Sequence, residues 1–324
     1  MLDASAAPRA LALPSELVER LRCPACRASV VVREDRVECA GGCPPFPVRN
    51  GVPVLVDERD CVLTHEEILR SANAFNRPRS RAEVWAKRLV PSPSRNVTGA
   101  RVRKRFMSLV GEGNRSPAIL RVGNGEDAVT FDDLPASRVV SSDLFFYPGT
   151  NVVCDAHRIP FADETFDGVT GIAVLEHVAD PARAVAEIHR VLRPRGVVLA
   201  ETPFMQQVHG GAFDFTRFTD LGHRRLFRSF EEIERGACGG TGMSLAWAWH
   251  YFLLSLLGGR GKRRRPITAF AYLTSFWLRF FDRALIARRE TLDGASGLYF
   301  LGRKGDRTLS DRELIGEYRG AIGS

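Results

Sequence analysis

Four cysteines near the beginning of the chain could bind a metal ion. Cys23 and Cys26 form one close pair, and Cys39 and Cys43 form a second pair about a dozen residues later. Two pairs of thiols at this spacing are typical of a tetrahedral structural zinc site, in which a short loop presents each pair to the metal. Four incidental buried cysteines would not explain the pairing, so we predict a structural Zn2+ with no open coordination position.

Acidic side chains and a histidine lie at the ends of short apolar runs in the middle of the chain. Asp143, Asp155 and the pair Glu176 and His177 each follow such a run. If the runs are parallel strands, their carboxyl ends meet at one edge of a sheet, where ligands bind in this class of fold. Carboxylates there can accept hydrogen bonds from hydroxyl or amino groups. Each of these side chains could instead be a solvated loop residue or the cap of a turn.

His209 and Asp214 lie in a loop rich in aromatic residues, 204–219, which follows another apolar run. Because the unperturbed pKa of a histidine lies near working pH, His209 could act as a general base, with Asp214 orienting its ring. The alternative is a histidine that holds the loop through a hydrogen bond to the backbone.

The elements that would position these side chains alternate between strand and helix. Apolar runs at 152–154, 166–174 and 197–200 predict three strands. Before the last of them, Asp180 is a helix N-cap and Pro181 the first helical residue, and apolar residues follow at helical spacing. Apolar strands that alternate with helices predict an α/β fold, with a parallel sheet covered by helices on both faces.

The order and types of these residues closely resemble those of class I S-adenosylmethionine-dependent methyltransferases, in particular the methyltransferase type 11 group. The resembling segments are 155–161, 166–167, 174–178, 180–181 and 190–196. The resemblance implies a Rossmann-like class I sheet, the cofactor S-adenosylmethionine and the transfer of a methyl group. It also implies that Asp143 accepts hydrogen bonds from the ribose hydroxyls and that Asp155 receives the adenine amino group.

A glycine turn at 123–125 matches the first motif of this family. Glycine lets the backbone turn tightly and pass close to a ligand. Two of the family's usual three glycines are present, and Arg121 replaces the acidic residue that is common at the end of the preceding strand. The residues that the resemblance assigns to the cofactor are Gly123, Asn124, Gly125, Asp143, Leu144, Asp155, Ala156, Ala173 and His177.

The segment 21–57 resembles the small Trm112-like zinc-ribbon domain. In related proteins this module accompanies or activates methyltransferases, and an N-terminal zinc finger also occurs in some ribosomal RNA guanine methyltransferases. We therefore expect four parts: a zinc-ribbon domain at 1–59, a helical connector at 60–115, a methyltransferase domain at 116–308 and a C-terminal tail at 309–324.

A helical insertion is expected at 251–290, within the methyltransferase domain. It contains two apolar segments separated by the basic tract 260–265, so the region 245–285 could contact a lipid-linked substrate or a membrane surface. The alternative is a helical hairpin packed on the core, with a solvated basic loop. The elements predicted around it are a basic amphipathic helix at 221–234, a strand at 242–249 and a last strand at 297–301.

The composition is that of a globular protein with a proper core. The chain has 324 residues, of which 44% are hydrophobic, and this excludes global disorder. Lys and Arg outnumber Asp and Glu by 46 to 38, a net charge of +8 that favours anionic partners. Seven cysteines, an odd number, argue against a disulfide framework. Because we recognise no secretory signal and no run long enough to span a bilayer, we expect a cytoplasmic protein that could contact the inner face of the membrane.

Three functions are compatible with these features. The leading hypothesis is O-methylation of a small-molecule or glycan acceptor, which could be lipid-linked, because the loop 204–219 resembles that of methyltransferases in glycan and natural-product biosynthesis. The second is methylation of ribosomal or transfer RNA, supported by the zinc ribbon and the basic tract, although no Asn-Pro-Pro-Tyr-like motif follows the fourth strand. The third is a degenerate methyltransferase fold that serves as an interaction protein, suggested by Arg121 and the missing third glycine.

Overall fold

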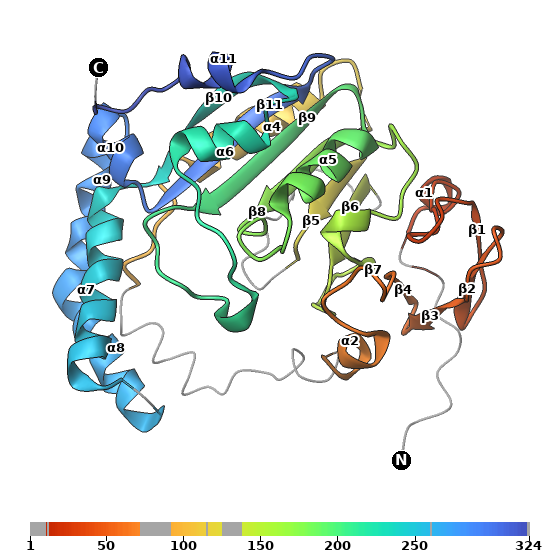
Figure 1. The fold of residues 1–324 in the computed structure, drawn as a ribbon, viewed down its shortest axis with the longest axis horizontal. Coiled ribbons are helices and arrows are strands. Elements are labelled where there is room, and N and C mark those ends of the chain that lie inside the picture. Colours follow the sequence, from red (N-terminus) through yellow and green to blue (C-terminus); the bar gives the residue numbers. More distant parts are fainter. Residues whose placement is uncertain are drawn as a thin grey trace.

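The computed structural model describes residues 11, 13–71, 92–114, 116–124, 138–259 and 261–322. Its centre is an eleven-stranded sheet in the order β1-β2-β3-β4-β7-β6-β5-β8-β9-β11-β10 (Figure 1). The five parallel strands of the middle are β5 (Ile119–Val122), β6 (Val139–Asp143), β7 (Val152–Cys154), β8 (Phe166–Ile172) and β9 (Leu192–Pro203).

The parallel strands change direction of winding between β5 and β8. From β5 the chain moves outward through β6 to β7, then crosses back to β8 on the other side of β5 and continues to β9. At such a switch point the loops that follow the two central strands leave in opposite directions and open a crevice at their carboxyl ends. Gly123 and Ala173, which follow β5 and β8, therefore stand at this crevice.

The sheet ends in an antiparallel pair on the β9 side. The last strand, β11 (Gly297–Lys304), lies between β9 and β10 (Phe230–Gly239) and runs antiparallel to both. The prediction of a last strand at 297–301 is confirmed, because the apolar residues at its start are buried between its two neighbours.

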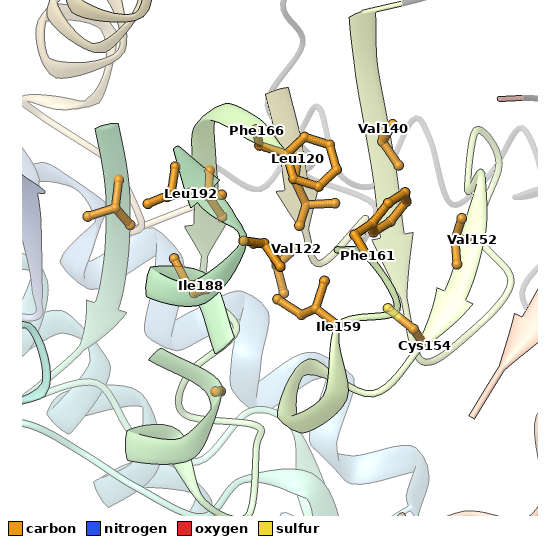
Figure 2. Packing of buried hydrophobic residues seen from close by; sticks show 14 of the residues in the cluster. Leu120, Val122, Val140, Val152, Cys154, Ile159, Phe161, Phe166, Ile188 and Leu192 are labelled. Atoms are coloured by element: carbon orange, nitrogen blue, oxygen red, sulfur yellow. The ribbon is translucent and has the colours of Figure 1, made fainter. Parts of the chain in front are cut away.

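Helices cover both faces of the sheet, as predicted. Alternate residues of β9 point to opposite sides: Val198 and Ala200 join the core beneath α5 (Pro181–Val191), whereas Val197 and Leu199 join the core beneath α4 (Gly99–Val110). Figure 2 shows the α5 side, where Ile188 of this helix lies among side chains of the sheet. The α/β fold with a mostly parallel sheet is confirmed.

The N-terminal strands continue the same sheet. They are β1 (Val30–Val32), β2 (Arg36–Cys39), β3 (Phe46–Arg49) and β4 (Val52–Leu55), after the short helix α1 (Ser15–Val18). Neighbours among them are antiparallel, but β4 pairs in parallel with β7, the outermost of the five central strands. Arg27 adds a hydrogen bond of 2.7 Å to Glu187 of α5. The N-terminal part is therefore joined to the central sheet by backbone and side-chain contacts.

Two predicted elements are wrong. The helix expected at 221–234 ends early: α6 (Asp220–Leu226) is followed by strand β10 from Phe230, which pairs with β11 along its length. The strand expected at 242–249 is the start of the helix α7 (Thr241–Leu257). The Asp282 carboxylate accepts hydrogen bonds from the backbone N–H groups of Gly242 and Met243, so a residue far along the chain caps this helix.

The helical insertion between β10 and β11 consequently begins at Thr241, earlier than the predicted 251. It comprises α7, η4 (Gly261–Arg263), α8 (Arg264–Ser275), η5 (Phe276–Phe280), α9 (Asp282–Leu285) and α10 (Arg289–Gly294). The remaining helices are α2 (His65–Ser71), η2 (Ala156–Arg158), η3 (Gly211–Phe213) and α11 (Asp311–Ile315). Across the described ranges, none of the helices combines the length and apolar character needed to cross a bilayer.

Candidate active site

A cavity of about 1340 Å³ lies at the carboxyl ends of the parallel strands. Residues that follow β5, β6, β7, β8 and β9 all line it, and residues of the connector and of α7 close its sides. The predicted site residues that line it are Gly123, Asp143, Leu144, Asp155, Ala156, Ala173, His177 and His209. Two predicted residues, Asn124 and Asp214, do not line it, and Gly125 lies outside the described part of the chain.

The turn after β5 requires glycine at position 123. Gly123 has a φ of +82°, and a Cβ there would lie 2.3 Å from a methyl carbon of Val174. The next residue, Asn124, is buried, and its backbone N–H donates to the Asp143 carboxylate at 2.7 Å. Its side chain donates to Thr150, so Asn124 fixes the turn and the carboxylate from behind the cavity wall.

Asp143 is held at the end of β6 by backbone groups. One carboxylate oxygen accepts from Asn124 N–H and the other accepts from Phe145 N–H at 2.9 Å. Burial raises the pKa of Asp143, and these backbone hydrogen bonds oppose the shift. The side chain is thus fixed in direction, at the place where the resemblance puts a ribose-binding acid.

Asp155 follows β7 and is paired with a histidine. The Nδ1 atom of His157 lies 2.6 Å from its carboxylate, and Nε2 of the same ring accepts from the Asp180 N–H at 3.0 Å. Burial would raise the pKa of Asp155, but the hydrogen bonds from the His157 side chain and backbone outweigh it and lower the pKa. His157 thus connects Asp155 to the N-cap of α5, a role that the sequence did not indicate.

Arg121, which replaces an acidic residue of the family motif, directs its guanidinium to the neighbouring strand. Its Nε and one terminal nitrogen donate to the Ser141 hydroxyl at 3.1 and 2.5 Å. Burial lowers the pKa of Arg121. The residue contributes to the cavity wall, and this contact draws its side chain toward β6.

Glu176 is the most unusual group in the cavity. Its side chain is fully buried, and neither carboxylate oxygen has a hydrogen-bond partner among the described residues. Nε2 of His177 lies 3.7 Å from one oxygen, and Nε2 of His209 lies 3.8 Å from the same oxygen. Burial raises the pKa of Glu176 to about 8. The sequence placed Glu176 at a strand end but gave it no role.

The two histidines direct their Nε2 atoms toward Glu176. His177 Nδ1 lies 2.7 Å from the carbonyl oxygen of Phe213, and His209 Nδ1 lies 3.3 Å from that of Gln207. Because a carbonyl oxygen only accepts, each Nδ1 carries a proton, and Nε2 has a lone pair when the ring is neutral. Burial lowers the pKa of His209, which favours this neutral form. One carboxyl and two imidazoles at this spacing could transfer a proton or hold a transition metal.

Asp214 contacts the loop backbone instead of the His209 ring. Its carboxylate accepts from the N–H groups of His209 and Gly210 at 2.8 and 3.0 Å and forms an ion pair with Arg217. The nearest ring nitrogen of His209 is 3.6 Å away, beyond hydrogen-bond distance. Burial raises the pKa of Asp214, but Arg217 and the backbone donors lower it overall. These contacts correct the predicted geometry: Asp214 shapes the loop that carries His209.

A second group of unpaired polar atoms lies at the end of β9. One oxygen of Glu201 accepts from the Asn96 amide at 2.7 Å, whereas the other has no partner in the described chain. The hydroxyls of Thr202 and Ser296 are also buried without a partner there. Trp247 of α7 lines the cavity with them. The sequence did not identify this group, because it combines residues from four distant segments.

The four predicted zinc ligands converge. The sulfur atoms of Cys23, Cys26, Cys39 and Cys43 all lie within 4.8 Å of one another, and those of Cys26 and Cys39 are 3.4 Å apart. Sulfurs at about 2.3 Å from a tetrahedral ion would be about 3.8 Å apart, so the cluster fits Zn2+. The Gly41 N–H donates to the Cys39 sulfur at 3.2 Å, as expected for a loop that presents a thiolate to a metal.

Comparison with known proteins identifies the central segment. Residues 109–200 match the family described as "Methyltransferase domain". This segment is similar to that family, and it makes up less than a third of the chain. It contains the glycine turn, the two carboxylates and the Glu176 and His177 pair, so the matched region includes most of the cavity-lining strand ends.

Individual relatives match shorter stretches. The chain is 49% identical over 53 residues to the ubiquinone/menaquinone biosynthesis C-methyltransferase UbiE of Desulfotalea psychrophila, covering 16% of this chain and 22% of that protein. It is 34% identical over 94 residues to a probable S-adenosylmethionine-dependent methyltransferase of Mycobacterium tuberculosis, covering 29% of this chain and 33% of that protein. It therefore spans well under two thirds of the length of these curated relatives.

A solved structure titled a putative sarcosine dimethylglycine methyltransferase from Galdieria sulphuraria aligns with 64% of this chain and 86% of its own, at 15% identity and a TM-score of 0.40. The mitochondrial arginine-hydroxylase NDUFAF5 of Mus musculus is 26% identical over 190 residues, covering 48% of this chain and 54% of that protein. The curated relatives carry names of more than one reaction, so the reaction has to be argued from the site.

Proposed function

We propose that the chain is an S-adenosylmethionine-dependent methyltransferase that methylates an oxygen of a glycan or natural-product intermediate. The observation that carries the proposal is the arrangement of Asp143 and Asp155 at the ends of adjacent parallel strands, beside the tight turn at Gly123, in one cavity. This arrangement supports binding of an adenosine: two hydroxyls can donate to Asp143 and an amino group can donate to Asp155.

The residues present fit such a cofactor. Gly123 lines the cavity without a side chain, and Leu144 and Ala156 follow the two carboxylates along the cavity wall. Ala173 has a φ of +52° and also faces the cavity. When bound, S-adenosylmethionine supplies an electrophilic methyl group on a positively charged sulfur.

Activation of the acceptor is assigned to the cluster of Glu176, His177 and His209. Methyl transfer is an in-line displacement, so the protein must align the acceptor and remove the proton of a hydroxyl nucleophile. His209 Nε2 faces the cavity with a lone pair and can accept that proton as the oxygen–carbon bond forms and the carbon–sulfur bond breaks. The imidazolium that results would lie beside Glu176, which stabilises it once ionised.

The unpaired polar atoms at the end of β9 favour an acceptor with several hydroxyl groups. A buried polar atom without a partner costs free energy, and a bound ligand can supply the missing hydrogen bond. Glu201 Oε1 and the hydroxyls of Thr202 and Ser296 are such atoms, and all three residues line the cavity. A glycan or a hydroxylated natural product offers donors and acceptors at this density.

The N-terminal strands belong to this proposal as a zinc ribbon of the Trm112-like kind. The four cysteines would hold one structural Zn2+, and they lie in the part of the chain that joins the central sheet through β4. A complete set of four thiolates keeps water off the metal, so the ion would stabilise the fold and take no part in methyl transfer.

The direct test is the methylation state of cellular molecules with and without the protein. We expect mass spectrometry of metabolites and glycans to show one acceptor that lacks a single methyl group in cells without it. Complementation with wild type should restore the methyl group, whereas His209→Gln should lower kcat roughly 100-fold or more with cofactor affinity kept. As a control, complementation with Glu290→Gln, a change at an exposed residue, should restore the methyl group fully.

Two results would contradict the proposal. An unchanged profile of all acceptors would remove the enzymatic assignment. A methyl group missing from ribosomal or transfer RNA instead would support the alternative RNA methyltransferase, for which the basic residues Arg263, Arg264 and Arg265 are the structural argument.

A further inference from the structure

The helical insertion carries large apolar side chains on a stripe that faces away from the protein. In α7 one side, which includes Met243 and Leu253, is buried. Leu245, Phe252 and Leu256 recur at helical spacing on the opposite side, and all three are exposed. The helix therefore has two apolar sides, of which the protein covers one.

The second helix of the insertion extends this stripe into a surface. α8 packs along α7 (Figure 1). The Trp249 indole N–H donates to the Thr274 hydroxyl at 2.9 Å. We call the large exposed apolar side chains of α7, of α8 and of the following residues 276–281 the apolar face; each is between 47% and 65% exposed. Its members are Leu245, Phe252, Leu256, Leu257, Phe270, Leu273, Trp277, Phe280 and Phe281. Clustered apolar side chains of this kind mark interaction sites.

The charged residues of the segment that carries the apolar face have a single sign. The sequence from 241 to 281 contains no aspartate and no glutamate. Arg263, Arg264 and Arg265 are exposed at the beginning of α8. The first acidic residue that follows, Asp282, is buried and occupied in capping α7. An anionic partner therefore meets attraction and no repulsion from this segment.

The geometry points to a docking surface for an anionic lipid bilayer. Leucine, phenylalanine and tryptophan on one face with cations beside them are the composition of helices that lie in a membrane interface. A nucleic acid would suit the cations but leave the apolar face in water. A second copy of the chain would cover the apolar face. It would also bring the arginines of both copies close together, and this segment contains no acidic residue to pair with them.

The docking surface is connected to the cavity. Met243 and Trp247 of α7 line the cavity wall, and the Tyr251 hydroxyl donates to the backbone of Val208, next to His209. A bilayer on the apolar face would therefore lie against the helix that forms the wall. If the proposed methyl transfer holds, this position suits an acceptor with a lipid anchor, but membrane binding itself does not depend on that reaction.

Vesicle binding of the full-length protein tests the inference. We expect it to float with vesicles that contain phosphatidylglycerol and to bind phosphatidylcholine vesicles far more weakly, with affinity that falls as salt rises. Changing Arg263, Arg264 and Arg265 to Glu should weaken binding to anionic vesicles by more than about 100-fold, since the loss of the three cations alone accounts for that factor at about fivefold each. Phe252→Ser with Leu256→Ser should abolish it.

Matched controls use exposed residues elsewhere. Ile315→Ser replaces an exposed apolar side chain outside the insertion, and Arg312→Glu reverses an exposed charge of α11, so both variants should bind like wild type. Equal binding to both kinds of vesicle, or none to either, would overturn the inference. Two other results would also overturn it. In one, the protein does not bind vesicles but forms a dimer that Phe252→Ser dissociates. In the other, RNA binds the three arginines and vesicles do not.

Discussion

Two buried glutamates show how the surroundings of one residue type decide its use. Burial tends to raise the pKa of both Glu176 and Glu187. Around Glu187, hydrogen bonds from Arg190 and Arg27 outweigh burial and lower the pKa, so this residue is an ionised structural partner. In the described part of the chain no arginine or lysine donates a hydrogen bond to Glu176, which keeps a raised pKa in a cavity, the pattern expected of a functional group.

The raised pKa of Glu176 makes a prediction about stability. Between about pH 4.5 and about pH 8 the folded state holds a proton on Glu176 that the unfolded chain has already released. The unfolded state then binds fewer protons, so the free energy of unfolding falls as pH rises through this window, by roughly 3–5 kcal/mol. Glu176→Gln should remove this dependence and make the ligand-free protein more stable than wild type near pH 8.

Urea denaturation of the ligand-free protein across this pH range measures the effect. Glu290→Gln, on the exposed surface of α10, is the matched control and should leave the pH dependence of wild type unchanged. A variant Glu176→Gln that loses stability with pH as steeply as wild type would show that the carboxyl is ionised in the folded protein.

At the scale of elements, the sequence predicted features that neighbouring residues determine, such as the beginning of a helix. The N-cap Asp180 accepts from the Arg183 N–H, and Pro181 begins α5 as predicted. The element after Phe230 could not be predicted in this way, because β10 is a strand through its pairing with β11, more than fifty residues later in the sequence. α7 was mistaken for a strand because its aromatic residues favour strands, whereas the capping carboxylate comes from Asp282.

The N-terminal strands yield a prediction about the proposed zinc ribbon. Replacing the buried Cys23 by Ser should release the ion, because three thiolates bind Zn2+ far less tightly than four. The melting temperature should fall by about 10 °C, since metal binding contributes to the folding of such modules. Elemental analysis and thermal denaturation measure both effects. The control Cys238→Ala, outside the cluster, should retain one zinc per chain; full zinc content in Cys23→Ser would rule out the four-cysteine site.

At the scale of the whole molecule, the sheet joins parts that the sequence separated. The zinc-ribbon domain at 1–59 was expected to be distinct, but β4 lies in the central sheet next to β7. The connector contributes Val62 and Asn96 to the cavity wall, and its Asp60 forms ion pairs with Arg158 and Arg183. These contacts depend on residues far apart in the chain.

The candidate site also has a part that could be predicted from the sequence and a part that could not. The strand-end acids could be predicted, because each follows its own apolar run and the family motif orders them. The group around Glu201 and the pairing of Asp155 with His157 could not be predicted, because they exist only once the loops have folded over the sheet.

The central claim is that Asp143 and Asp155 hold an adenosine at the carboxyl ends of β6 and β7, and isothermal titration with S-adenosylhomocysteine tests it most directly. Wild type should bind, and Asp143→Asn and Asp155→Asn should each weaken binding about 10- to 100-fold, the effect of a lost hydrogen bond to a charged group. The exposed control Asp306→Asn should bind like wild type. No binding by wild type, or equal affinity in all variants, would contradict the account.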